Sequence, residues 1–227
     1  MILLKKKVRA LLGQGTGVSS EYVHPFNYTN ASYFLYLERM LNIVEGIPGD
    51  VVECGVGRGR SLLLFGFLVK DRKSVRKIWG FDSFSGFPEP VKEDTSAMRV
   101  TKKGDKNLHT IATVLAFFAS AGLGQDFIRS QMTLIKGYFS ESLSKYRGDG
   151  IALLHLDGDL YESYKDPLRE LYPKVVKGGV ILFDEYLNTT EHAKFPGAQK
   201  AIDEFFGDRV QKISRDVGTG KYYFIKE

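Results

Sequence analysis

The sequence has almost no cysteine and no long apolar run. Its single cysteine, Cys54, has no partner for an internal disulfide, which excludes a disulfide-rich scaffold and favours a reducing compartment. No stretch offers the ~20 apolar residues of a membrane-spanning helix. The apolar residues 2–4 are too few for a secretory signal, and they precede the basic residues that should come first. We therefore expect a cytoplasmic protein with no transmembrane segment.

Internal repeats and low-complexity segments are also missing. Hydrophobic residues make up 43% and charged residues 26% of the 227 residues, which are ordinary values for a chain with a packed core. These values exclude a collagen-like or disordered protein, and the length suits one globular domain.

A large excess of charge of one sign is absent as well. The 32 Lys and Arg residues against 27 Asp and Glu residues give a net charge of +5, and a basic balance points to nucleic acid only where the charge is clustered. The one dense run, at residues 5–9, is most simply a solvated helix face. Since there is no basic stripe and no N-P-P-[YF]-like motif, we expect no nucleic-acid partner.

Short apolar runs alternate with helical stretches along most of the chain. This alternation predicts an α/β fold with a doubly wound, mostly parallel sheet, closed by a C-terminal antiparallel hairpin. Ligands bind such sheets at the carboxyl ends of the strands. The expected strands are residues 51–54, 77–81, 132–135, 151–156, 180–183, 209–214 and 222–225, and the expected helices are residues 30–44, 61–69, 105–121, 162–176 and 198–206.

A glycine-rich turn follows the first of these strands. Glycines at positions 55, 57 and 59 allow a tight turn and bring backbone N–H groups against a ligand, as in nicotinamide, flavin, nucleotide and S-adenosylmethionine sites. Their spacing differs from the nicotinamide pattern G-x-G-x-x-G, and Glu53 would repel a pyrophosphate. Because Glu53 would attract a sulfonium ligand that carries an amino group, S-adenosylmethionine is the expected cofactor.

Residues after the second and third expected strands complete the predicted cofactor site. Asp82 is placed to accept both hydroxyls of an adenosine ribose, although a helix cap or an Asx turn would also suit it. The segment after residue 136 offers an aromatic face for an adenine, with a plain loop as the alternative. The candidate cofactor-binding residues are Glu53, Gly55, Gly57, Arg60, Ser61, Asp82, Ser83, Gly137, Tyr138 and Phe139.

Four carboxylates follow the fourth and fifth expected strands: Asp157, Asp159, Asp184 and Glu185. Two like charges ~4 Å apart repel by about 4 kcal/mol at an effective dielectric constant of 20, so either some pKa values rise or a divalent cation binds. Hard oxygen ligands favour Mg²⁺, with Ca²⁺ and Mn²⁺ as alternatives. Capping of the following helix and loop is the interpretation without a metal. The neighbouring His155 is expected in the core.

The motifs around these residues resemble those of the TylF/MycF (macrocin O-methyltransferase) family. The resemblance covers the chain from about residue 47 to its end, and it is carried by residues 52–61, 80–88, 156–163, 171–186 and 196–206. It implies a seven-stranded Rossmann-like class I methyltransferase domain over residues 47–227, preceded by a helical lead-in or lid over residues 1–46. Enzymes of this kind are commonly dimers or larger, so a homo-oligomer is implied too.

The resemblance further implies S-adenosylmethionine- and Mg²⁺-dependent methylation of a sugar hydroxyl. Carried over by motif, Asp157 would be the general base, and the metal ligands would be Asp159, Asp184 and Glu185. The family often has Asp-Asp where this chain has Asp184-Glu185, and the lead-in does not match the macrolide-tailoring members well. The acceptor therefore stays open as a nucleotide sugar, a polysaccharide unit or a glycosylated natural product.

Two other functions fit less well. A catechol-type metal-dependent O-methyltransferase would have Lys and Asn where this chain has Leu160 and Glu185. A non-catalytic binding module would not need four carboxylates beside an intact glycine turn. Residues 88–106 are a candidate acceptor loop. The candidate lid residues are Tyr22, Phe26, Tyr28 and Tyr33, for which core packing is the commoner role.

Overall fold

The computed structural model describes residues 27–187 and 191–227. The chain forms two compact units, Met1–Ala31 and Ser32–Glu227, and every strand among the described residues belongs to the second unit. The basic run at residues 5–9 and the lid candidates Tyr22 and Phe26 lie outside the described residues. The division into a lead-in of residues 1–46 and a catalytic domain of residues 47–227 stays a prediction.

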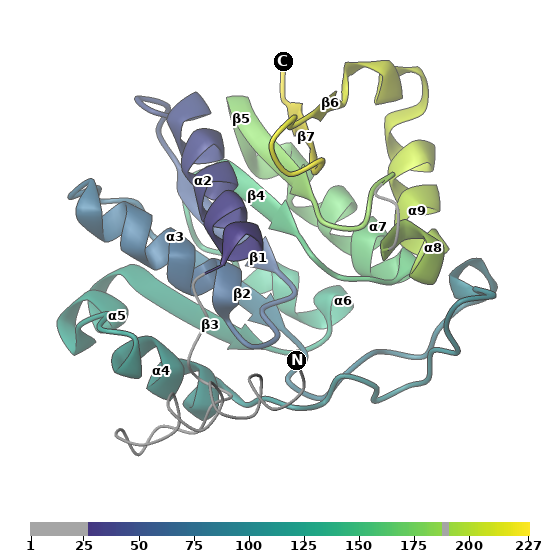
Figure 1. Cartoon of the computed structure of the whole chain (residues 1–227), viewed down its shortest axis with the longest axis horizontal. Coiled ribbons are helices and arrows are strands. Elements are labelled where there is room, and N and C mark those ends of the chain that lie inside the picture. The colour runs from purple at the N-terminus through teal and green to yellow at the C-terminus, as the bar shows by residue number, and fades with distance from the viewer. Residues whose placement is uncertain (1–26, 188–190) are drawn as a thin grey trace, which may run out of the picture. The chain divides into compact units, whose positions relative to one another are not determined.

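Seven strands form one sheet in the order β3-β2-β1-β4-β5-β7-β6 (Figure 1). The first five pair in parallel, whereas β7 is antiparallel to both β5 and β6. The predicted fold class is therefore confirmed, and the strand order reverses between β1 and β4. The strands are β1 Asp50–Cys54, β2 Ile78–Asp82, β3 Met132–Lys136, β4 Ile151–Leu156, β5 Val175–Phe183, β6 Ser214–Arg215 and β7 Tyr222–Ile225.

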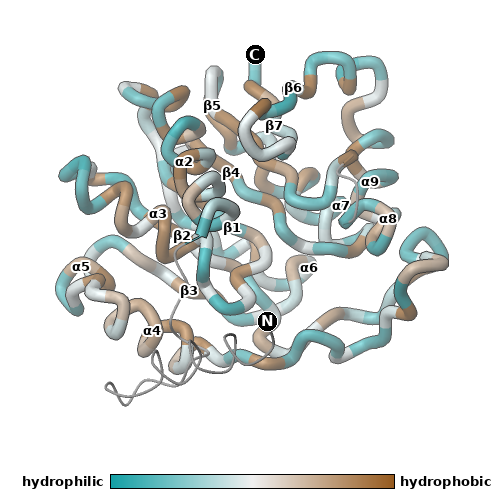
Figure 2. Tube along the Cα trace, viewed as in Figure 1, coloured by the Kyte–Doolittle hydropathy of each residue, from teal (hydrophilic) through white to brown (hydrophobic). Residues whose placement is uncertain are grey.

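Helices cover both faces of this sheet. Helices α2 to α5 pack against one face and α7 and α9 against the other, which is why all six residues of β4 are buried. Helix α4 is hydrophobic along most of its length (Figure 2). No helix in residues 27–187 or 191–227 is long and apolar enough to cross a membrane. The helices are α2 Tyr28–Ile43, α3 Arg60–Asp71, α4 Ile111–Ser120, α5 Gln125–Gln131, α6 Phe139–Ser142, α7 Tyr161–Glu170, α8 Glu191–Lys194 and α9 Pro196–Phe206.

Three predicted elements are corrected by the structure. The expected helix over residues 105–121 begins only at Ile111, where Thr110 caps its first turn. Most of the expected strand over residues 209–214 is a 3-10 helix, Gly207–Lys212, because Gly207 ends α9 with a φ of 52° and redirects the chain. The expected helix over residues 162–176 is too long. Helix α7 contains Pro167 and ends at Glu170. A 3-10 turn over Tyr172–Lys174 follows it, and β5 begins at Val175.

Candidate active site

A cavity of about 690 Å³ lies at the carboxyl ends of the central strands. Its size is that of a small-molecule site, and its walls come from the segments that follow β1, β2, β3 and β4. This is the edge of the sheet where the sequence predicts the ligand. The predicted site residues that line the cavity are Gly55, Gly57, Arg60, Ser61, Asp82, Ser83, Tyr138, Phe139, Asp157 and Asp159.

The glycine turn after β1 is held between two neighbouring strands. Gly55 has a φ of 99°, and a Cβ atom built on it would lie 1.7 Å from the carbonyl oxygen of Asp157, at the end of β4. Only glycine fits such an approach. On the other side, the backbone N–H of Gly57 donates to Oδ2 of Asp82 at 2.9 Å, at the end of β2.

Asp82 combines the two interpretations that its sequence position allowed. Its Oδ1 accepts a hydrogen bond from the backbone N–H of Phe84 at 2.7 Å, which is the geometry of an Asx turn. Each carboxylate oxygen thus has one protein donor, and a carboxylate has about four lone-pair sites. Asp82 therefore keeps acceptor capacity toward the cavity that it lines.

Glu53 and Gly137, two predicted cofactor contacts, are absent from the cavity wall. The backbone N–H of Gly137 instead donates to the carbonyl oxygen of Asp82 at 3.0 Å. Glu53 is fully buried, and its Oε1 accepts a hydrogen bond from Ser61 and lies 2.8 Å from Nδ1 of His155. Its Oε2 is buried without a hydrogen-bond partner among the described residues. Glu53 thus stabilises the first turn of α3 through its hydrogen bond with Ser61.

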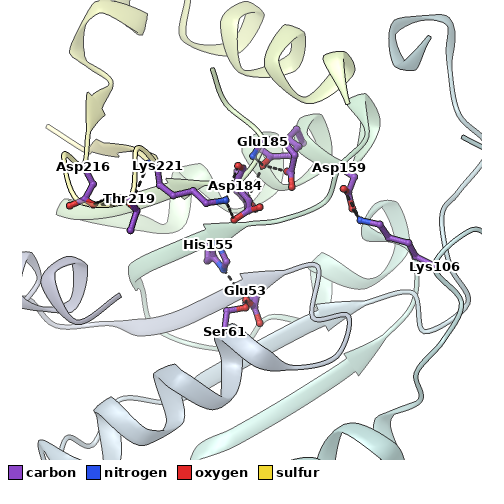
Figure 3. A network of polar contacts seen from close by, with 12 residues as sticks. Glu53, Ser61, Lys106, His155, Asp159, Asp184, Glu185, Asp216, Thr219 and Lys221 are labelled. Carbon is purple, nitrogen blue, oxygen red and sulfur yellow. Dashed lines mark hydrogen bonds and ion pairs between the residues drawn. The ribbon is translucent and has the colours of Figure 1, made fainter. Parts of the chain in front are cut away.

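His155 is a core residue, as predicted, but it is also part of this polar network (Figure 3). Burial by itself lowers the pKa of His155, whereas the hydrogen bond and charge of Glu53 outweigh burial and leave that pKa raised. The sequence offered no signal for this pairing, because the two residues lie 102 positions apart and meet only through the register of β1 and β4.

The four acidic residues do converge, but not in the predicted combination. Ligand atoms of Asp157, Asp159 and Glu185 lie within 4.8 Å of one another, and a second such group consists of His155, Asp157 and Asp184. The expected ligand set paired Asp184 with Asp159 and Glu185, and the structure instead makes Asp157 the member common to both groups. Asp159 has a φ of 62°, a strained conformation for a non-glycine residue that is typical of functional sites.

Two lysines balance part of this negative charge, and the sequence analysis missed both. Nζ of Lys106 lies 2.8 Å and 2.7 Å from the two carboxylate oxygens of Asp159. Nζ of Lys221, which precedes β7, lies 2.5 Å from Oδ1 of Asp184 (Figure 3). The turn that carries Lys221 is itself tied down, because Asp216 accepts hydrogen bonds from Thr219 and from Arg39 of α2.

The remaining acids bind protons more tightly than free carboxylic acids do. Burial, and next the charge of Asp184, raise the pKa of Asp157 to about 8. Burial and the charge of Asp157 raise the pKa of Glu185 well above its usual range, even though Tyr164 donates to its Oε2 at 2.5 Å. Burial also acts on Asp184, but Lys221 outweighs it and lowers the pKa of that carboxyl. The all-oxygen group of Asp157, Asp159 and Glu185 fits a hard divalent cation such as Mg²⁺.

The fold and the cavity define a Rossmann-like methyltransferase, and comparisons with known proteins agree. Demethyldecarbamoylnovobiocin O-methyltransferase of Streptomyces niveus is 33% identical over 207 residues, covering 82% of this chain and 74% of its own. Mycinamicin III 3''-O-methyltransferase of Micromonospora griseorubida is 29% identical over 187 residues, covering 75% and 67%. The crystal structure of CalS11, a calicheamicin methyltransferase, superposes with a TM-score of 0.76 at 25% identity, covering 97% of this chain and 90% of that one.

The family model of macrocin-O-methyltransferase (TylF) matches residues 37–219. The chain therefore belongs to this family, as its motifs predicted. It is an O-methyltransferase.

Proposed function

We propose that the protein transfers a methyl group from S-adenosylmethionine to a hydroxyl of a sugar-containing acceptor, with a divalent cation at the acid cluster. The observation that carries the proposal is one cavity that is lined both by the glycine turn with Asp82 and by Asp157 with Asp159. By their names, these relatives act on demethyldecarbamoylnovobiocin and on mycinamicin III. A glycosylated natural product is therefore the first acceptor class to test, ahead of a nucleotide sugar or a polysaccharide unit.

The cofactor half of the proposal rests on the residues around the glycine turn. Asp82 has the spare acceptor capacity that two ribose hydroxyls require. The aromatic side chains of Tyr138 and Phe139 line the same cavity and offer a face for the adenine. Glu53 does not line the cavity, and it contributes through Ser61, which lines the cavity and donates a hydrogen bond to Oε1 of Glu53.

The acceptor half rests on the acid cluster. An alcohol is a poor nucleophile until it loses its proton, and the pKa of Asp157, about 8, suits a residue that takes up a proton in the neutral range. We assign Asp157 as the general base and Asp159 and Glu185 as ligands of the cation. A bound Mg²⁺ would supply Lewis acidity toward the acceptor hydroxyl.

A thermal-shift comparison tests the cofactor half. S-adenosylhomocysteine at 100 times its Kd should stabilise the protein by roughly 2.7 kcal/mol, whereas NADH should not. Asp82→Asn should lose this shift, and the exposed Asp71→Asn in helix α3 is the matched control. Absence of a shift with S-adenosylhomocysteine would reject the cofactor assignment and leave a non-catalytic binding module as the better interpretation.

Asp157→Asn and Asp159→Asn test the acceptor half, because Asp157 is geometrically able to hold the cation as well. We expect Asp157→Asn to lose about 10²–10⁴-fold in turnover while it still binds S-adenosylhomocysteine and Mn²⁺. Asp159→Asn should lose Mn²⁺ binding. If Asp157→Asn also loses Mn²⁺ binding, Asp157 is a ligand and not the base. Activity that survives exhaustive treatment with EDTA would remove the cation from the proposal.

The family resemblance also supports a homo-oligomer. We propose that the protein is a dimer or larger, and light scattering coupled to size-exclusion chromatography would measure its mass. A monomer at micromolar concentration would contradict this assignment without affecting the assigned chemistry.

A further inference from the structure

Asp159 is held by a lysine at both of its oxygens. The two contacts of Lys106, at 2.8 Å and 2.7 Å, engage Oδ1 and Oδ2 of a side chain that is only 7% exposed, while the lysine itself is 47% exposed. The same ammonium lies 5.3 Å from the ring centre of Phe87 and 4.9 Å from that of Phe195, where the aromatic faces attract a cation. This set of residues therefore forms a site for one positive charge.

The segment that carries Lys106 is anchored at its base. It connects β2 to α4, and its two ends pair through hydrogen bonds between Phe87 and the backbone of Gly104 and Asp105. Further along, Asp94 accepts a hydrogen bond from the backbone N–H of Tyr161, the first residue of α7, at 2.7 Å. The backbone around Lys106 is thus fixed, whereas its side chain has a flexible four-carbon stem and is 47% exposed, so other rotamers are open to it.

The two lysines of the acid cluster differ in this respect. Lys221 also donates to the carbonyl oxygen of Asp184 at 3.1 Å, and it is 20% exposed. Its side chain is therefore held in place by both the backbone and the carboxylate of Asp184. Lys106 contacts the carboxylate oxygens and aromatic faces at the edge of the cavity that it lines. Of the two, Lys106 is the cation that can be exchanged for another.

We infer that Lys106 is an exchangeable internal cation. It occupies Asp159 while no divalent cation is bound, and its ammonium leaves that carboxylate for the cavity when a divalent cation binds. The inference rests on the proposed function, because it assumes that Asp159 is a ligand of that cation. With an ammonium on both oxygens of Asp159, a divalent cation bound to the same carboxylate would lie close to a second positive charge. The two cations repel each other, so they compete for Asp159. Lys106 therefore lowers the affinity for the cation and keeps the strained Asp159 neutralised in its absence.

The test is Mn²⁺ binding to the full chain, measured from the electron paramagnetic resonance signal of free Mn²⁺. Lys106→Met removes the competing charge and keeps the length of the side chain, so it should bind Mn²⁺ about tenfold more tightly than the wild type or better. Lys106→Arg keeps the charge, and its guanidinium can pair with both oxygens of a carboxylate, so this variant should bind Mn²⁺ no more tightly than the wild type. The exposed Lys103→Met on the same segment is the matched control and should change nothing.

The Mn²⁺ measurements test the exchange and the cation assignment separately. A Kd for Mn²⁺ that is unchanged or weaker in Lys106→Met, while the wild type binds Mn²⁺, overturns the exchange and leaves the proposed function standing. If neither protein binds Mn²⁺ although both bind S-adenosylhomocysteine, the cation assignment itself fails, and the exchange fails with it. Unchanged binding of S-adenosylhomocysteine shows that Lys106→Met is folded.

Discussion

Replacing Asp157 by Asn should make the metal-free protein more stable, although it destroys the proposed base. The pKa of this carboxyl rises from 3.8 to about 8 in the folded protein, and in the unfolded chain it returns to about 4. Between these values the folded state holds a proton that the unfolded state has released, so stability falls as the pH rises. The Asn side chain of the variant does not titrate, so the variant does not lose stability in this way as the pH rises.

The size of the effect follows from the shift in pKa. At about 1.4 kcal/mol per pKa unit, the loss at pH 7 is at most about 4 kcal/mol. Asp157 faces the cavity and is only partly buried, so we expect solvent screening to reduce the gain of the variant to about 1–3 kcal/mol.

Urea unfolding in EDTA at pH 5 and pH 8 measures this gain. Asp157→Asn should be clearly more stable than the wild type at pH 8, and the difference in urea midpoint should be much smaller at pH 5. Mg²⁺ added to the wild type should narrow the difference. Equal dependence of the free energy of unfolding on pH in both proteins, or a variant that is less stable at pH 8, would refute the reasoning.

Two further variants test the residues that hold the glycine turn and the acid cluster in place. Gly55→Ala should destabilise the protein by about 2 kcal/mol or more and weaken binding of S-adenosylhomocysteine, because the new Cβ would meet the Asp157 carbonyl oxygen. The control is Gly124→Ala, where no atom lies within 4 Å of the new Cβ. Equal unfolding of the two variants in urea would contradict the prediction. Lys221→Met should cost about 1–3 kcal/mol at pH 7, because it removes the ammonium that donates to the partly buried carboxylate of Asp184. Lys212→Met, which breaks the exposed pair with Glu227, should cost less than about 1 kcal/mol, and similar losses in the two lysine variants would reject the structural role of Lys221.

The sequence predicted those elements of the fold whose ends are marked by glycine or polar residues. Strand β4 was predicted with its observed bounds, Ile151–Leu156, because a continuous apolar run lies between Gly150 and the polar Asp157. Residues 209–214 contain Val210 and Ile213 at a spacing that also suits a helical turn, and the conformation of Gly207 settled the choice. Local pattern alone could not decide between the two.

The same contrast holds for the site. Parallel strands bring their carboxyl ends to one edge, so the convergence of Asp157, Asp159 and Glu185 was predictable from topology. How they combine was not, because it depends on side-chain directions and on two lysines that lie 53 and 37 positions from the acids they contact. Lys106 and Lys221 are also ordinary residues for surface loops, and no motif distinguished them.

The position of Lys221 has a consequence for how the protein is made. A growing chain that has reached Glu185 already contains all four carboxylates, but it lacks the lysine that neutralises Asp184 and the two strands, β6 and β7, that complete the sheet. The acid cluster therefore stays unbalanced until the final hairpin is synthesised and pairs with β5. Neutralisation of Asp184 is thus coupled to the completion of the sheet, because Lys221 belongs to the same hairpin as β6 and β7.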